Sequence, residues 1–246
     1  MNLRDLFLKI EPALFSTLAP ALKSGRARVQ RSLVAQKYLK GNGAEIGAFV
    51  QTIMTPRGSS TKYIDQYPAS YWQGTEYRNL DIVDPDIVDD AKHLHTVTDA
   101  QFDYLSAAHV LEHIDDPIEA IKNWLRVVKP GGYLIIAVPD KRFTPDNPRA
   151  LTPFDHLLRD HTEGPQVSAE EDHRDFGYHH LGITDAVALE EYVGQNQHDI
   201  HFHTWTVTSF VHFLAELNTY LGGDAFEIVE ARLNINEALC VLRKGI

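Results

Sequence analysis

Cysteine and long apolar runs are scarce in this chain. Among its 246 residues the only cysteine is Cys240, so no disulfide can form within the chain and no cysteine-based metal site is available. Cys240 lies in the apolar run 238–242, which predicts a buried structural thiol and fits a reducing, cytoplasmic setting. No run of about 18 apolar residues exists, so we expect no membrane span. We also expect no signal peptide, because the first residues lack its order of basic, apolar and small residues.

Positive charge is also in deficit. The formal net charge is −11, which argues against nucleic acid as a partner because phosphate binding needs a basic surface. The charge is unevenly distributed: residues 1–40 carry +6 and the remainder carries −17.

The basic N-terminal part has a helical pattern. Apolar residues recur at three- and four-residue steps over 3–22, which predicts an amphipathic helix in which Pro12 begins or kinks a turn. Ser24-Gly25 is expected to end it, and a second helix is expected over 26–39. We expect residues 1–40 to dock on their own domain as a helical cap. A basic amphipathic helix can also lie on an anionic membrane, here at its inner face.

Glycine is missing where dinucleotide-binding proteins need it. A short predicted strand ends at Glu45-Ile46-Gly47, but Phe49 and Gln51 follow where a G-x-G-x-x-G fingerprint has further glycines. An NAD-dependent oxidoreductase is therefore only a distant alternative. Gly47 still lets a ligand approach the backbone closely. Asp65, at the end of the next predicted strand, is placed to accept hydrogen bonds from ribose hydroxyls.

Strand and helix signals alternate over residues 43–140, which predicts right-handed crossovers and a parallel sheet. The last strand is a continuous apolar run, typical of a strand buried on both faces. A helix over 118–128 precedes it and ends at Pro130-Gly131-Gly132. The expected strands are 44–46, 62–65, one within 78–83, 102–107 and 133–139.

The C-terminal part begins with a polar insertion, 141–205, that contains most of the histidines and has helix only in pieces. A long irregular insertion in a compact domain is usually functional or disordered. A helix is then expected over 206–221, capped by Thr206 or Thr208 and stopped by Gly222-Gly223. A hairpin of strands 226–233 and 237–242 should follow. The eight histidines of the insertion are His156, His161, His173, His179, His180, His198, His201 and His203.

Two segments carry a specific resemblance. FDYLSAAHVLEHIDDP (102–117) and KPGGYLIIAVPD (129–140), at this spacing, resemble the fourth and fifth strand regions of class I S-adenosylmethionine-dependent methyltransferases of the methyltransferase type 11 group. The resemblance implies an α/β Rossmann-like fold, with a seven-stranded, mostly parallel sheet and a C-terminal antiparallel hairpin. It implies one methyltransferase domain over 41–246, with 141–205 as a histidine-rich substrate lid.

The same resemblance implies the residues that bind S-adenosylmethionine. The methionine part would meet the end of the first strand, the ribose would meet Asp65, and the adenine would lie beside Asp90-Ala91. The end of the fourth strand and the turn after it would complete the site. Phe49 departs from the family pattern, which has a second glycine there. The cofactor-binding residues implied in this way are Glu45, Gly47, Ala48, Asp65, Asp90, Ala91, Ala107, His109 and Glu112.

The sulfonium methyl of that cofactor is already activated, so the protein mainly has to align the two reactants. A hydroxyl acceptor also benefits from a general base, often His or Asp. His109 and His113 follow the fourth strand, four residues apart on one expected helical face, and Asp140 ends the fifth strand.

Asp155-His156 is a further candidate for catalysis, because an adjacent carboxylate can orient an imidazole as a base. Asp160-His161 repeats the pair five residues later, which on a helix turns it about 140° away. The histidines could instead bind a divalent metal ion, which imidazole and carboxylate ligands suit. Their spacings match no tight metal-binding motif, however, so we expect no metal site.

The polar lid favours a saccharide or another hydroxylated small molecule as the acceptor, and O-methylation as the reaction. Runs such as PDKRF and TPFDHL resemble those of methyltransferases in polysaccharide and glycan biosynthesis. One alternative is a C- or N-methyltransferase that acts on a non-sugar metabolite. Another is a non-catalytic, cofactor-binding subunit that docks on a glycan-assembly enzyme.

Overall fold

The structure is a computed structural model that describes residues 12–195 and 200–246, with side chains from residue 25 onwards. Its centre is a seven-stranded sheet in the order β3-β2-β1-β4-β5-β7-β6. This confirms the predicted architecture. The strands are β1 (Asn42–Ile46), β2 (Ser60–Asp65), β3 (Ile87–Val88), β4 (Phe102–Ala108), β5 (Val128–Pro139), β6 (Phe226–Asn234) and β7 (Glu237–Lys244).

The order of the strands places a switch point at the centre of the sheet. β1 pairs in parallel with both β2 and β4, so the chain winds outwards to β3 on one side and to β5 on the other. β7 then pairs antiparallel with both β5 and β6. In open sheets of this kind, ligands bind outside the carboxyl ends of the strands at the switch point.

Alternating residues of the central strands face two different apolar layers. In β5, Leu134, Ile136 and Val138 belong to the larger core cluster, which includes Trp124 of α3 (Pro117–Val127) and Phe210 of α7 (Val207–Tyr220). The intervening Ile135 and Ala137 belong to a second cluster on the opposite face of the sheet. Because both faces of this strand are buried, its sequence is an unbroken run of apolar residues.

Cys240 of β7 lies in the larger core cluster and is fully buried. Burial raises the pKa of its thiol to about 12. The prediction of a buried structural thiol is therefore confirmed.

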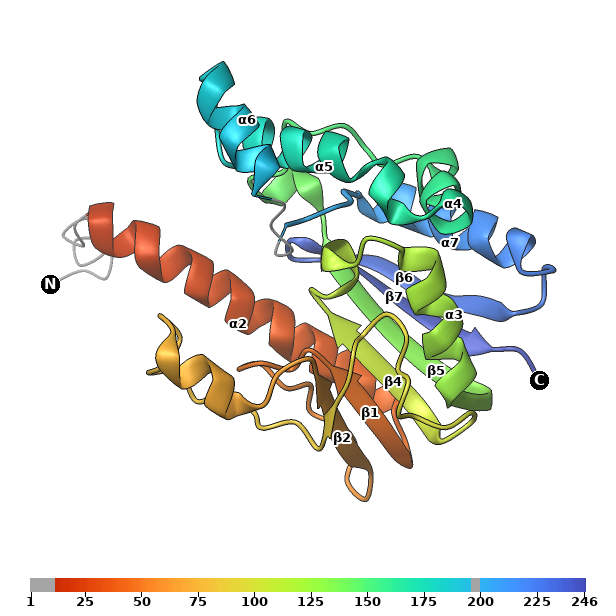
Figure 1. Cartoon of the computed structure of the whole chain (residues 1–246). Coiled ribbons are helices and arrows are strands. Elements are labelled where there is room, and N and C mark those ends of the chain that lie inside the picture. The colour runs from red at the N-terminus through yellow and green to blue at the C-terminus, as the bar shows by residue number, and fades with distance from the viewer. Residues whose placement is uncertain (1–11, 196–199) are drawn as a thin grey trace, which may run out of the picture.

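The opposite face of the sheet is covered by α2 (Pro12–Tyr38), which runs along one side of the molecule in Figure 1. Val34, Ala35 and Leu39 pack there against the second cluster. The predicted break at Ser24-Gly25 is wrong, because α2 is one continuous helix. A glycine inside a helix costs only about 1 kcal/mol, which the packing of the helix face offsets. Residues 1–11 of the predicted first helix lie outside the described residues.

A second prediction is also wrong. The described residues 78–83 form no strand, and the third strand is β3, where Ile64 pairs with Ile87. Leu80 is exposed, whereas Ile87 packs against the larger core cluster. The apolar residues of 78–83 therefore do not belong to a buried strand.

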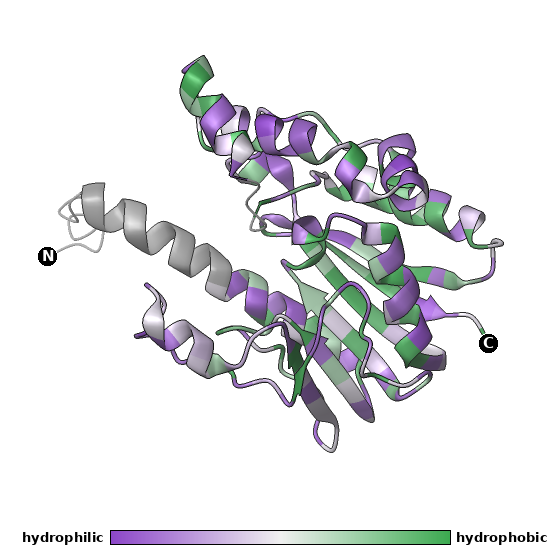
Figure 2. Cartoon of the chain, in the orientation of Figure 1, coloured by the Kyte–Doolittle hydropathy of each residue, from purple (hydrophilic) through white to green (hydrophobic). Residues whose placement is uncertain are grey.

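Residues 141–205 form a helical layer that lies across the top of the view in Figure 1. Its chain leaves the sheet at Asp140 and returns at Trp205, and these two residues form a parallel bridge. Figure 2 shows that much of this layer is hydrophilic, whereas the central strands are mostly hydrophobic. The elements are η3 (Lys141–Phe143), α4 (Phe154–Glu163), η4 (Pro165–Val167), α5 (Ala169–Asp175), η5 (Phe176–His180) and α6 (Ala186–Gly194).

None of the helices in the described ranges combines the length and the apolar character needed to cross a membrane.

Candidate functional site

A cavity of about 1180 Å³ opens at the switch point of the sheet. Its wall is formed by the residues that follow β1, β2, β3 and β4, together with parts of α2, the lid and the β6–β7 turn. Most of the predicted cofactor residues line it: Glu45, Gly47, Ala48, Asp65, Asp90, Ala91 and His109. His113 lines it as well.

The backbone after β1 comes close to the segment that follows β4. Gly47 has φ +66°, and a Cβ placed there would lie 2.5 Å from Cγ2 of Val110. Phe49 also has a positive φ, +45°, although it is not a glycine. Its ring packs edge-on against Trp72 and Tyr77, with ring centroids 5.3 and 5.4 Å away. At the position of Phe49 the family pattern has a glycine, which adopts a left-handed backbone easily. Phe49 adopts the same backbone conformation at a cost in strain.

Glu45 is a buried carboxyl group at the end of β1. Its exposed fraction is 2%, and both its oxygens accept the N–H of Ile53 at 3.1 Å. Burial raises the pKa of Glu45 to about 7, against the opposing effects of that N–H and of Arg31 and Arg28. This carboxyl group therefore changes charge near neutral pH.

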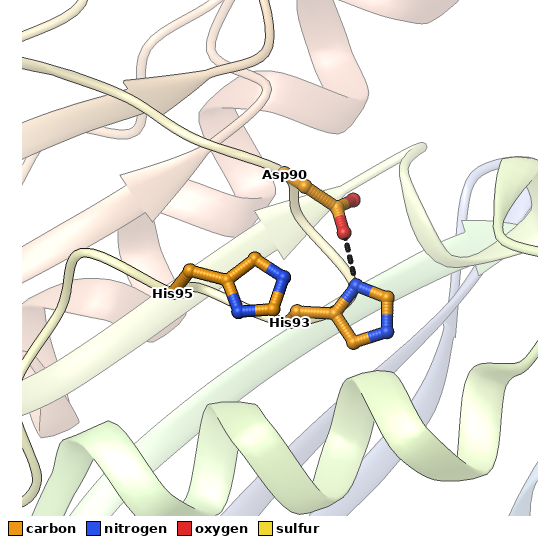
Figure 3. Close-up of side chains that lie close together, drawn as sticks. All are labelled: Asp90, His93 and His95. Carbon is orange, nitrogen blue, oxygen red and sulfur yellow. Dashed lines mark hydrogen bonds and ion pairs between the residues drawn. The ribbon is translucent and has the colours of Figure 1, made fainter.

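Asp65 and Asp90 follow β2 and β3 and line the cavity. Burial raises the pKa of Asp65, while the backbone N–H groups of Tyr67 and Gln66 oppose the shift. Figure 3 shows Asp90 facing the ring of His93, with which it forms an ion pair, while the ring of His95 stacks beside His93. The carboxylate of Asp90 is thus oriented by a neighbour that also lines the cavity.

His109 is held between two carboxylates. Its Nε2 lies 2.8 Å from Glu237 Oε2, and its Nδ1 lies 3.4 Å from Glu112 Oε1. Burial lowers its pKa, but the hydrogen bonds with Glu112 and Glu237 outweigh burial and raise the pKa to about 9. At neutral pH His109 is therefore an imidazolium, which has no free lone pair with which to accept a proton.

The structure corrects the expected helical face. His109 has φ +58°, and only Leu111–His113 form a short 3-10 turn, η2. The two histidines therefore do not share one face of an α-helix. The ring of His113 instead meets the ring of His201 from the lid, with centroids 4.7 Å apart.

Two predicted cofactor residues lie behind the wall of the cavity. Ala107 is buried in the larger core cluster, and Glu112 is buried under His109. In the described structure the neighbouring Ala108 lines the cavity in place of Ala107.

Three candidates for catalysis lie elsewhere in the described structure. Asp140 is fully buried and binds Arg142 at 2.7 Å and the N–H of Val207 at 3.0 Å, so it holds the start of α7. His156 does not pair with its neighbour Asp155, which is exposed on α4. It faces Asp160 and Asp172 instead. The partner of His161 is Asp116, at 2.9 Å, and not Asp160.

Sequence reasoning missed a group of aromatic residues at the cavity. Tyr67 and Tyr71 stack with ring centroids 4.1 Å apart, and Trp72 meets both rings edge-on. All three residues line the cavity. The signal was present in the sequence as a tyrosine- and tryptophan-rich stretch directly after Asp65.

A family model described as "Methyltransferase domain" matches residues 43–217 of the chain. The chain belongs to this family. It is an S-adenosylmethionine-dependent methyltransferase, and S-adenosylmethionine is its cofactor. No curated protein matches the chain.

Solved structures share the fold of the methyltransferase at low sequence identity. A putative zinc-dependent alcohol dehydrogenase from Rhodobacter sphaeroides is 13% identical, with a TM-score of 0.51 over 88% of this chain and 90% of that one. A putative methyltransferase from Haloferax volcanii, in complex with the activator Trm112, is 11% identical, with a TM-score of 0.50 over 93% and 96%. A SAM-dependent methyltransferase from Methanosarcina mazei is 18% identical, with a TM-score of 0.48 over 87% and 97%.

The residues of the cavity fit the cofactor of the methyltransferase. Gly47 lines the cavity, and because it has no side chain a ligand can approach its backbone closely. Glu45 offers a carboxyl group near the same backbone, suited to an ammonium group. Asp65 offers acceptor oxygens at the end of β2, suited to vicinal hydroxyls.

Proposed function

We propose that the methyltransferase methylates a hydroxyl oxygen of a small hydroxylated molecule, a saccharide in the first place, with a histidine as general base. The observation that carries the proposal is the wall of the cavity outside the strand ends. It combines the polar side chains of His113 and Asp115 with the exposed ring of Tyr71 and with Trp72. Aromatic rings and hydrogen-bonding side chains are the two surfaces that a sugar ring needs.

The size of the cavity supports the proposal. Pockets for one drug-sized ligand measure about 300–1,000 Å³. The cavity of about 1180 Å³ therefore has room for the cofactor and a small second molecule.

The general base in this proposal is His113. Of the candidates from the sequence, His109 and His113 line the cavity, and the raised pKa of His109 keeps that residue protonated. S-adenosylmethionine supplies an activated methyl group when bound. His113 would accept the proton that the acceptor hydroxyl loses as its oxygen bonds to the methyl carbon.

The test is an acceptor screen with S-adenosylmethionine, in which formation of S-adenosylhomocysteine is measured for sugars, glycosides and matched amines. We expect turnover with hydroxylated acceptors, and we expect His113→Gln to lower kcat by about 10²–10⁴-fold while cofactor affinity stays unchanged. His212→Gln, an exposed position on α7, is the matched control.

Three outcomes contradict the proposal. Turnover confined to amine acceptors favours an N-methyltransferase. Full activity in His113→Gln removes this residue as the base. Tight cofactor binding without turnover of any acceptor favours the non-catalytic subunit.

A further inference from the structure

Two acidic residues and one histidine of the lid converge away from the cavity. His156 and Asp160 lie one turn apart on α4, and Asp172 lies on α5. His156 Nε2 is 3.1 Å from Asp160 Oδ2 and 3.5 Å from Asp172 Oδ1. Each residue offers one ligand atom, and these atoms all lie within 4.8 Å of one another. We call these three residues the α4–α5 cluster.

The carboxylates of the α4–α5 cluster are buried and incompletely paired. Asp160 is 0% exposed and Asp172 is 7% exposed. Ser168 donates to Oδ1 of Asp160 at 2.7 Å. Oδ2 of Asp160 and Nε2 of His156 lie 3.1 Å apart as an ion pair, but within the described residues neither has a partner in hydrogen-bond geometry. A buried carboxylate oxygen without such a partner is costly, so the cluster favours a bound cation.

The charges of the cluster also favour a cation. Asp160 and Asp172 are both buried, and the single imidazole of His156 lies beside both of them. Two carboxylates at this distance repel each other in a site with little water.

We propose that the α4–α5 cluster binds a divalent transition-metal ion, zinc in the first place, through His156, Asp160 and Asp172. One imidazole and two carboxylates form a donor set that suits such ions, with water completing the coordination. The two carboxylates neutralise the charge of the ion. The ion joins α4 to α5 and so fixes the shape of the lid.

Three other groups of acidic residues and histidines in the described structure are less suited. Asp90 and its two histidines lie at the surface, partly exposed. Asp146 already binds His180, His201 and Arg149. Both oxygens of Glu112 also lack a partner in hydrogen-bond geometry among the described residues, but the imidazolium of His109 lies 3.4 Å away. The α4–α5 cluster differs from these three groups because two buried carboxylates share one imidazole.

The spacing of the sequence predicted no metal site. His156 and Asp160 are only one helical turn apart, and Asp172 joins them because the lid folds α5 against α4. A search for short motifs therefore does not find this group.

The test uses the full-length protein, treated with EDTA and dialysed, without cofactor or acceptor. Zinc chloride is titrated by calorimetry, cobalt(II) is titrated by its visible absorption, and Tm is recorded with and without zinc. We expect one equivalent to bind and Tm to rise, because an ion that binds only the folded state stabilises it.

Matched variants locate the ion. We expect Asp172→Asn, which keeps the shape of the side chain, and His156→Gln to weaken zinc binding by at least about 100-fold and to abolish the rise in Tm. Asp155→Asn, an exposed position on the same helix, should bind zinc as the parent does.

The proposal is overturned if the parent protein binds no zinc. It is also overturned if Asp172→Asn binds zinc normally while His95→Gln or His180→Gln does not, since the ion then lies in another group. Neither result depends on methyl transfer, so this test and the acceptor screen can fail separately.

Discussion

The sheet and the lid of this methyltransferase are stabilised in different ways. The sheet buries two apolar layers, one on each face, and its ligand site is built from strand ends. The lid has one small apolar cluster around Phe176 and Phe202. Its other buried groups are mostly charged or polar, among them Asp146, Arg149 and Asp160. Figure 2 shows the same contrast in hydropathy.

This difference determines how each part responds to substitution. Apolar burial is non-directional and scales with area, so a sheet tolerates many changes of similar volume. A buried polar network needs every partner, because a group that loses its partner keeps its desolvation cost. The lid should therefore be sensitive to the loss of single charged groups, and the apolar layers of the sheet should be less sensitive to single substitutions.

The largest effect is expected from Arg149→Ala. Arg149 is 3% exposed and donates to Asp146, Asp175 and the backbone oxygens of His201 and Phe202. Its loss leaves buried Asp146 with only His180 and His201 as partners and leaves the backbone oxygens of His201 and Phe202 without this donor, which should cost about 3–5 kcal/mol. Urea unfolding measures the loss, and limited proteolysis should cut first within 141–205.

Arg159→Ala is the control for that prediction. The side chain of Arg159 is 42% exposed and lies 3.8 Å from Glu171, so its loss should change stability by less than about 1 kcal/mol. If both variants lost the same free energy of unfolding, the buried network of the lid would be no more important for stability than its surface ion pairs.

The second prediction concerns the sheet side. Asp65→Ala removes the acceptor at the end of β2, and hydrogen bonds to a charged group are worth about 1.5–3 kcal/mol. Affinity for S-adenosylhomocysteine should fall by about 10–150-fold in calorimetry, with little change in Tm. Unchanged affinity would mean that Asp65 does not hold the ribose.

The third prediction is a pH dependence at Glu45. The pKa of this carboxyl group is raised to about 7, so its ionised fraction grows as pH rises through neutrality. If the ionised form holds the cofactor's ammonium group, affinity for S-adenosylhomocysteine should rise about eightfold from about pH 6 to about pH 7.5. Glu45→Gln should abolish the rise, and a parent profile as flat as that of the variant would exclude this role.

The smallest effect is expected at Phe49. Phe49→Ala loses the edge-on contacts with Trp72 and Tyr77 but keeps a non-glycine residue at φ +45°. Phe49→Gly loses the same contacts and relieves the strain. The glycine variant should therefore be more stable than the alanine variant by about 1 kcal/mol in urea unfolding, and the reverse order would show that the backbone there is not strained.

The sheet was largely predictable from the sequence because its signals are local. The apolar run of β5, the helix expected over 118–128 and the capping residue Thr206 each depend on signals within a few residues. The third strand was misplaced because β3 is only two residues long and carries little local signal.

The contacts of the site and of the lid were less predictable because they join residues far apart in the chain. Glu237 meets His109 across 128 positions, and Asp146 meets His201 across 55. A sequence shows which groups can ionise but not which of them share one buried space. For that reason the sequence suggests Asp155-His156 as a pair, whereas the fold places His156 beside Asp160 and Asp172.

The bridge between Asp140 and Trp205 lets the lid change in length or sequence independently of the sheet. Because the two ends of the insertion meet at one point, a shorter, longer or unrelated segment can be inserted there without shifting the register of β5 against β7. An exchange of this kind would replace the helical layer while the strand ends that line the cavity stay in place. The position is therefore a natural junction for building chimeric methyltransferases.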